Sequence, residues 1–187
     1  MSGFKFESLD LKGAYLITCF SSSDLRGGFT KIFEKEIFNE AGIKFLLNES
    51  FLSISAKNVI RGLHFQMKNS QSKLICVPYG KIYDVIVDLR KNSPTFKEWR
   101  GFELSAENKK ALLIPKGFAH GFASLIDDTI VLYQCDGAYD KDSDTGIRFD
   151  DPDIGIVWPV RKKEVINSKR DSQLMSLIEY IDLQTYQ

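Results

Sequence analysis

The sequence predicts an all-β protein with a jelly-roll barrel, because short runs rich in β-branched and aromatic residues follow one another along it. Pro, Gly and Asn separate these runs at close spacing, for example in LICVPYG, IYDVIVDLR and the turn NSPTF, between residues 74 and 96. Such spacing leaves no room for the helices that connect parallel strands. Eight or more short strands in about 140 residues therefore favour an antiparallel jelly roll.

The N-terminal part predicts one strand, one hairpin turn and one short helix. Residues 14–20 (AYLITCF) are β-formers that suit a half-buried strand. The segment 21–29 (SSSDLRGGF) is rich in turn residues, and Gly27 and Gly28 permit unusual backbone angles beside the charged pair Asp24 and Arg26. A hairpin turn with a solvated arginine is the ordinary structural explanation of this segment. Residues 34–41 contain good helix formers, and Gly42 stands where a C-terminal cap belongs.

The C-terminal part predicts further strands and then a change of period. Residues 99–125 predict two or three strands around the turn AENKK, and residues 129–139 (TIVLYQCDGAY) predict another. From Asp171 onward Leu174, Leu177, Ile178 and Ile181 follow the spacing of an amphipathic helix. We find no internal repeat and no linker. The expected organisation is a single domain over residues 1–187, with a helical segment from about residue 171.

Composition excludes several classes of function. The 25 Lys and Arg residues balance the 25 Asp and Glu residues, so no nucleic-acid or anionic-membrane partner is expected. The chain has no N-terminal apolar segment and no apolar run of about 18 residues that could span a membrane. The three cysteines, Cys19, Cys76 and Cys135, lie in strand-like runs without CxxC spacing. They predict buried thiols in a reducing compartment, and hence a cytoplasmic protein.

The segment IRGLHFQ, residues 60–66, contains one of only two histidines. In a regular strand, alternation would place Gly62, His64 and Gln66 on one face. The other face would hold Arg61, Leu63 and Phe65. A polar face of this kind could line a cavity. The alternative is that His64 is an ordinary structural histidine.

The histidine count argues against a metal site. Jelly-roll metalloproteins commonly use three histidines and a carboxylate, whereas this chain has only His64 and His120, which form no HxH pair. The cysteines also lack the spacing of metal ligands. We therefore expect no catalytic metal.

The remaining possibility is acid–base chemistry. His64 can act as a general base if a carboxylate holds its other ring nitrogen, and Tyr133 can act as an acid if its phenol is buried. Lys73 and Arg61 could supply positive charge for an oxyanion or a phosphate. His120 stands between glycines in IPKGFAHGF, where a ligand could approach the backbone closely. Each of these residues also has an ordinary structural explanation, as a core aromatic, a solvated cation or a core histidine.

Five ordered segments carry a resemblance to a known family. The chain resembles the dTDP-4-dehydrorhamnose 3,5-epimerases from about residue 15 to residue 171, in DLRGGF at Asp24, NVIRGLHFQ at Asn58, SKLICVPYGKIYDVIVDLRKNSPTF at Ser72, LSAENKKALLIPKGFAHGF at Leu104 and DPDIGIVWP at Asp151. The resemblance implies a cupin-type jelly roll, usually a homodimer. It also implies a nucleoside-diphospho-4-keto-sugar substrate, with no metal or redox cofactor.

The resemblance also implies roles for individual residues. His64 is similar to the family's base, Tyr133 to its proton donor, Asp171 to the carboxylate that orients the histidine, and Lys73 to the lysine near the C4 oxygen. Asp84 matches a second acid of the family near the active site. The implied ligands of the sugar, diphosphate and nucleotide are Arg26, Phe29, Arg61, His120 and Tyr139.

Five substrate-contacting positions depart from the family's pattern. Lys31 stands at a usual glutamate, Glu49 and Phe51 at a glutamine and an asparagine, Asp144 at a glutamate and Arg170 at a lysine. These departures predict a different sugar nucleotide, for which a GDP-linked 4-keto-heptose of bacterial surface polysaccharides is one hypothesis. The sequence leaves open whether C3 alone or both C3 and C5 are inverted. A non-catalytic sugar-nucleotide binding protein and a 3,4-ketoisomerase are the alternative functions.

Overall fold

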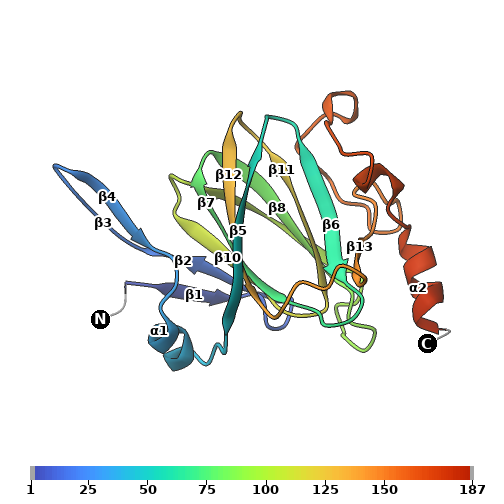
Figure 1. The fold of residues 1–187 in the computed structure, drawn as a ribbon, viewed down its shortest axis with the longest axis horizontal. Coiled ribbons are helices and arrows are strands. Elements are labelled where there is room, and N and C mark those ends of the chain that lie inside the picture. Colours follow the sequence, from blue (N-terminus) through green and yellow to red (C-terminus); the bar gives the residue numbers. More distant parts are fainter. Residues whose placement is uncertain (1–2, 186–187) are drawn as a thin grey trace.

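The computed structural model describes residues 3–185 and has two antiparallel sheets that face each other, as Figure 1 shows. The six-stranded sheet has the order β1 (Lys5–Ser8), β2 (Tyr15–Thr18), β10 (Lys110–Ile114), β7 (Ser72–Tyr79), β12 (Thr129–Asp136) and β5 (Leu47–Ser55). The five-stranded sheet has the order β13 (Asp144–Gly146), β6 (Ile60–Gln66), β11 (Phe118–Ser124), β8 (Lys81–Asp88) and β9 (Trp99–Ser105). The prediction of an all-β jelly roll is confirmed.

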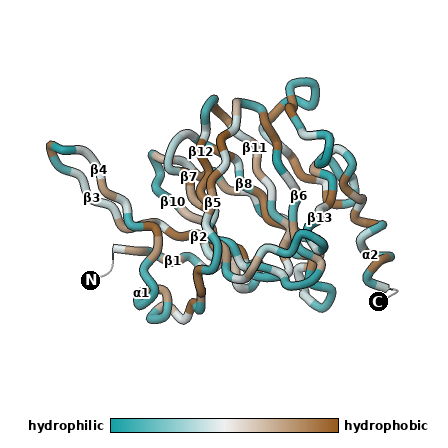
Figure 2. Tube along the Cα trace, in the orientation of Figure 1, coloured by the Kyte–Doolittle hydropathy of each residue, from teal (hydrophilic) through white to brown (hydrophobic). Residues whose placement is uncertain are grey.

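The main hydrophobic core lies between the two sheets. Ile75 and Val131 of the first sheet and Ile82, Ile86 and Phe122 of the second belong to one buried cluster. Alternation along each strand brings these side chains to the inner faces. Figure 2 shows hydrophobic residues recurring along the central strands. The core fills one part of the space between the sheets, and the polar side chains described below line another part.

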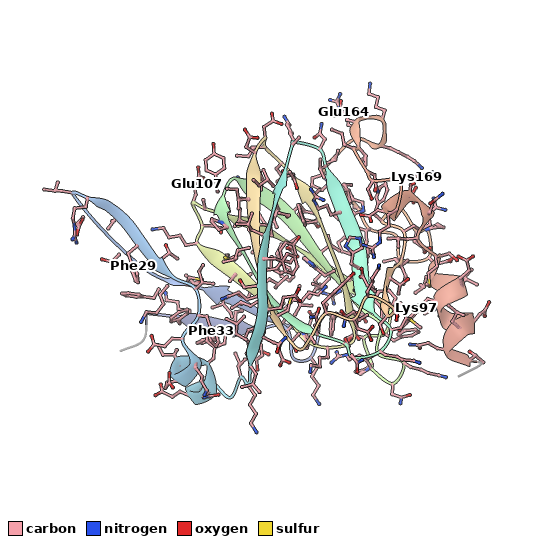
Figure 3. The ribbon with its side chains drawn as sticks, viewed as in Figure 1. Phe29, Phe33, Lys97, Glu107, Glu164 and Lys169 are labelled. Atoms are coloured by element: carbon pink, nitrogen blue, oxygen red, sulfur yellow. The ribbon has the colours of Figure 1, made fainter. Side chains whose placement is uncertain are left out.

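A two-stranded hairpin extends away from the barrel (Figure 1). It consists of β3 (Phe20–Asp24) and β4 (Gly27–Lys31), so the turn predicted for residues 21–29 narrows to Leu25 and Arg26. Gly27 has φ +121°, a conformation that favours glycine and explains its place at this turn. Figure 3 places Phe29 on this hairpin, away from the barrel.

The predicted N-terminal helix is present as α1 (Lys35–Glu40). Its buried residue, Phe38, packs edge-on against Phe6 and Phe33, with ring centroids 5.1 and 4.8 Å away. Gly42 follows the helix with φ +76°, as expected for a glycine that ends a helix.

The C-terminal helix begins later than predicted. Asp171 lies in a short 3-10 helix, η2 (Asp171–Gln173), and Leu174 is extended, whereas α2 spans Leu177–Thr185. A capping box sets the true start: the Ser176 backbone N–H donates to Glu179 Oε2 at 2.6 Å, and the Glu179 N–H donates to Ser176 Oγ at 3.2 Å.

The packing of α2 also differs from the prediction. Ile178 is 57% exposed, while Leu177 and Tyr180 are buried. Since the helix starts at residue 177, its apolar side is defined by Leu177, Tyr180 and Ile181, which pack with residues of the five-stranded sheet such as Phe65. Within residues 3–185, no helix is long and apolar enough to cross a bilayer.

Candidate functional site

A cavity of about 260 Å³ opens between the two sheets. Sixteen residues line it: Glu49, Phe51, Ser53, Arg61, His64, Phe65, Gln66, Gln71, Lys73, His120, Gly121, Phe122, Tyr133, Tyr139, Asp144 and Arg170. Ten of the fifteen residues singled out in the sequence are in this set. Two others, Asp171 and Asp84, hydrogen-bond to histidines of the cavity wall.

A β-bulge in β6 lets both Arg61 and His64 line the same cavity. His64 pairs with His120 of β11, but Arg61 pairs with Phe122, so two residues of β6 lie opposite Gly121 alone. A Cβ at Gly62 would lie 2.6 Å from the Gly121 Cα, which requires glycine there. The predicted alternation, with Arg61 on the face opposite His64, is therefore wrong, because the extra residue shifts the register between them.

The side chain of His64 is held by a carboxylate from the C-terminal part of the chain. His64 Nε2 lies 2.9 Å from Asp171 Oδ1, and the Gly62 backbone N–H donates to Oδ2 at 3.0 Å. Burial alone would raise the pKa of Asp171, but the hydrogen bonds and charge of His64, with the Gly62 N–H, outweigh it and lower the pKa. Asp171 is therefore a carboxylate at neutral pH.

This arrangement fixes which nitrogen of His64 is available. With Asp171 as the acceptor, Nε2 carries the proton and Nδ1 keeps a lone pair. Among the residues that the structure describes, Nδ1 has no hydrogen-bond partner. The side chain is 28% exposed and lines the cavity, so Nδ1 is suited to take a proton from a ligand.

A second histidine–carboxylate pair lies deeper in the same sheet. His120 Nε2 is 2.9 and 3.0 Å from the two oxygens of Asp84, on the neighbouring strand β8. Burial raises the pKa of Asp84, while the nearby His120 and Lys73 act in the opposite direction. This pair forms part of the cavity wall through His120.

Tyr133 and Lys73 line the cavity from the opposite sheet. Both lie on strands of the six-stranded sheet, whereas His64 and His120 lie on the five-stranded sheet. Burial raises the pKa of the Tyr133 phenol far above its ordinary value. Burial also lowers the pKa of the Lys73 ammonium. Neighbouring acidic groups raise that pKa, but they offset the effect of burial only in part. A buried phenol and a buried amine thus face the histidines in a site where electrostatic effects are strong.

Polar contacts organise the mouth of the cavity. Asp144 Oδ2 accepts hydrogen bonds from the Tyr139 hydroxyl at 3.0 Å and from Arg170 at 2.8 Å. Glu49 accepts one from Gln71 at 3.2 Å. Within residues 3–185, Glu49 is the one cavity-lining carboxylate without a cation at ion-pair distance.

Three predicted ligands lie outside the cavity. Arg26, Phe29 and Lys31 are on the β3–β4 hairpin, and none of them lines the pocket of its own chain. Arg26 instead pairs with Asp24 at 2.6 Å, and Lys31 pairs with Glu34. Within one chain, the structure does not bring these residues together with His64.

Several lining residues were not singled out as site residues: Ser53, Phe65, Gln66, Gln71, Gly121 and Phe122. Of these residues, only Gln66 was indicated by the sequence, because strand alternation places it on the same face as His64. Ser53 Oγ is buried in the cavity wall. No sequence pattern indicated Gln71, because its place at the cavity depends on residues distant in the chain: its side-chain amide donates to the Gly137 carbonyl and to Glu49.

The model of the family described as dTDP-4-dehydrorhamnose 3,5-epimerase matches residues 8–179. The chain belongs to this family. The dTDP-4-dehydrorhamnose 3,5-epimerase of Methanothermobacter thermautotrophicus is 44% identical over 180 residues, which cover 96% of this chain and 97% of that protein. The resemblance seen in the sequence is confirmed, and the chain is an enzyme of the epimerase class.

Solved structures of relatives share the fold closely. The dTDP-4-dehydrorhamnose 3,5-epimerase of Bacillus anthracis, solved with TDP and PPi bound, is 44% identical and has a TM-score of 0.90, covering 94% of this chain and 100% of that one. A 3'-monoepimerase of Streptomyces bikiniensis, in complex with dTDP-quinovose, is 31% identical with a TM-score of 0.88, covering 94% and 89%. The same fold is thus found in a 3,5-epimerase and in a monoepimerase.

Proposed function

We propose that this protein epimerises a nucleoside-diphospho-4-keto-sugar at C3, at C5 or at both, in the cytoplasmic synthesis of sugars for bacterial surface polysaccharides. The observation that carries the proposal is the His64–Asp171 pair, whose free Nδ1 belongs to a cavity that Tyr133 and Lys73 line from the opposite sheet. A base and an acid on opposing walls can act on opposite faces of one sugar ring.

The first step is removal of a proton next to the ketone. His64 Nδ1 takes the proton from C3 or C5, and the electron pair of that C–H bond forms the enolate, whose charge collects on the C4 oxygen. Lys73 stabilises this oxygen, and Asp171 stabilises the imidazolium. The ketone itself is the electron sink, so the proposal includes no metal and no cofactor.

The second step returns a proton from the other side. The enolate carbon forms a new C–H bond with the phenolic proton of Tyr133, which inverts the centre. The phenolate then regains a proton from solvent, and the His64 imidazolium releases one. Arg61 and Arg170 supply positive charge and N–H donors for the diphosphate and the sugar oxygens, and His120 binds the sugar from the cavity wall. Asp84 holds His120 in position.

The choice of nucleotide depends on Glu49, which has no cationic partner among residues 3–185. A carboxylate repels phosphate but accepts N–H donors, and guanine offers two adjacent ones where thymine offers one. Phe51 adds an apolar wall. The relatives' names favour a dTDP-linked sugar, whereas Glu49 favours a GDP-linked one, such as a 4-keto-heptose.

Incubation with dTDP- and GDP-linked 4-keto-sugars in deuterium oxide, read by NMR, tests the proposal. We expect deuterium at C3, C5 or both, with inversion, and faster turnover of the GDP-linked sugar. Binding without any exchange would instead identify a non-catalytic binding protein. Migration of the ketone to C3 would identify a 3,4-ketoisomerase. Tighter binding of dTDP than of GDP would contradict the role given to Glu49.

The proposal includes a homodimer in which the hairpin of one subunit completes the cavity of the other. Leu25 and Phe29 on the hairpin are 108% and 55% exposed, and Leu52 and Ile54 on the edge strand β5 are both 58% exposed. Apolar side chains exposed in this way support an interface. In such a dimer, Arg26, Phe29 and Lys31 would contact the substrate bound in the partner's cavity, since they do not line the cavity of their own chain.

Subunit mixing tests this dimer. Arg26→Ala and His64→Asn variants, each impaired alone, are refolded together so that heterodimers form. If the hairpin acts on the partner, one site of each heterodimer is intact and about a quarter of all sites regain activity. If the hairpin acts on its own chain, the mixture recovers nothing. Light scattering gives the oligomeric state of both variants.

A further inference from the structure

Phe51 lies flat against Tyr133. The two residues are directly opposite each other on the paired strands β5 and β12. Their rings stack with centroids 4.6 Å apart and an angle of 10° between the planes. Both side chains line the cavity, but Phe51 is 46% exposed while Tyr133 is 9% exposed. Phe51 therefore shields one face of the phenol from solvent.

A second ring meets Tyr133 at an angle. The His120 ring lies edge-on, with centroids 6.1 Å apart and 71° between the planes, and Asp84 holds that ring through two hydrogen bonds. Flat stacking on one side and an edge contact on another leave the phenol little freedom to rotate. Of these two contacts, only the Phe51 contact comes from an edge strand, since β5 ends its sheet.

We propose that Phe51 is a positioning residue that fixes the plane of the Tyr133 phenol for proton delivery to the substrate. The inference rests on the proposed epimerisation and concerns its second step. With the phenol held, the enolate carbon receives its proton from Tyr133 on the face opposite His64. Without the stack, the phenol turns away and the His64 imidazolium returns a proton to the original face. Because the partly exposed His64 imidazolium can exchange its proton with solvent before the return, this return incorporates solvent deuterium without inversion.

Deuterium uptake and inversion can be measured separately, and a general loss of structure would lower both together. Deuterium uptake reports proton removal by His64, whereas inversion reports delivery by Tyr133. In Phe51→Ala, measured at saturating substrate so that weaker binding does not contribute, we expect the ratio of inversion to uptake to fall at least about tenfold. Phe51→Leu keeps the apolar volume without the flat ring and should behave like Phe51→Ala. Phe51→Tyr keeps the ring and should restore the wild-type ratio.

Tyr79 provides a matched control for Phe51. Tyr79 is an aromatic residue that is 55% exposed and does not line the cavity, so Tyr79→Leu should leave the ratio of inversion to uptake unchanged. Equal falls in uptake and inversion in Phe51→Leu, or no change in either, would overturn the positioning role while leaving the epimerase proposal intact. An absence of uptake in the wild-type enzyme would overturn both.

Discussion

The cavity wall contains the same pair of residue types twice, in two different settings. His64 and His120 both place Nε2 at 2.9 Å from an aspartate oxygen. The His64 side chain is 28% exposed and its partner comes from η2, whereas the His120 side chain is 4% exposed and its partner lies on the adjacent strand. Asp171 also accepts a backbone N–H, but Asp84 gives both oxygens to His120.

This difference shows that exposure, rather than residue type, separates a reacting histidine from a supporting one. A base must reach the substrate proton and later exchange that proton with solvent, which the half-buried His64 can do. His120 is enclosed on nearly all sides and both carboxylate oxygens face it, so its position is rigid. We therefore expect loss of the first pair to affect the reaction and loss of the second to affect stability and binding.

The largest expected effect is on turnover in His64→Asn. Removal of a positioned general base should lower kcat by about 100- to 10,000-fold. The matched variant His120→Asn should mainly raise KM, because His120 is proposed to bind substrate. Steady-state kinetics on the preferred 4-keto-sugar nucleotide measure both. A larger loss of kcat in His120→Asn than in His64→Asn would reverse the roles of the two pairs.

Stability should show the opposite order. Asp84→Asn leaves a fully buried histidine with a weaker partner, and we expect it to lower the free energy of unfolding by about 3 kcal/mol. Asp171→Asn should cost only about 1 kcal/mol, since the exposed edge of His64 can be hydrated. Urea denaturation compares the two variants. Equal costs would mean that exposure does not distinguish the pairs.

The two aspartates should also give stability differences of opposite pH dependence. The pKa of Asp171 is lowered in the fold, so its contribution is complete above the ordinary value of 3.8 and is lost as the pH falls through the folded pKa. The pKa of Asp84 is raised, so its contribution is complete below 3.8 and is lost as the pH rises through the folded pKa.

Urea denaturation of wild type, Asp171→Asn and Asp84→Asn between about pH 3 and pH 7 measures these slopes. On acidification, the stability advantage of wild type over Asp171→Asn should shrink, and that over Asp84→Asn should grow. Two differences that move in the same direction would show that the two carboxyl groups titrate alike.

The smallest expected effect concerns the support of η2. Ser168 Oγ accepts the Asp171 backbone N–H at 3.0 Å, so Ser168→Ala should cost about 1 kcal/mol of stability and lower kcat only a few-fold. The exposed Ser172 hydroxyl in the same turn donates to the Lys169 carbonyl instead, and Ser172→Ala should leave kcat unchanged. Melting curves and kinetics of both variants test whether the turn positions Asp171.

The fold could be predicted from the sequence because turn residues and β-formers alternate regularly. The helix start was missed although its signal was present: Ser176 and Glu179 have the spacing of a capping box, which outweighed the apolar spacing that began at Leu174. Here a local hydrogen-bond pattern decided the boundary, while the hydrophobic period extended past it.

The site could be predicted only in part. Residue type alone suggested His64, Tyr133 and Lys73, and the cavity brings them together. The pairing of Asp171 with His64 joins residues 107 positions apart, and only the family resemblance predicted it. The bulge that turns Arg61 into the cavity depends on the partner strand β11, which a period-two reading of β6 cannot include.

The most direct test of the account is deuterium uptake from solvent by wild type, His64→Asn and His120→Asn, measured by NMR on one 4-keto-sugar nucleotide under saturating conditions. The account predicts uptake at C3 or C5 by the wild type, uptake reduced at least about 100-fold in His64→Asn, and substantial uptake in His120→Asn. Undiminished uptake in His64→Asn would contradict the assignment of His64 as the base.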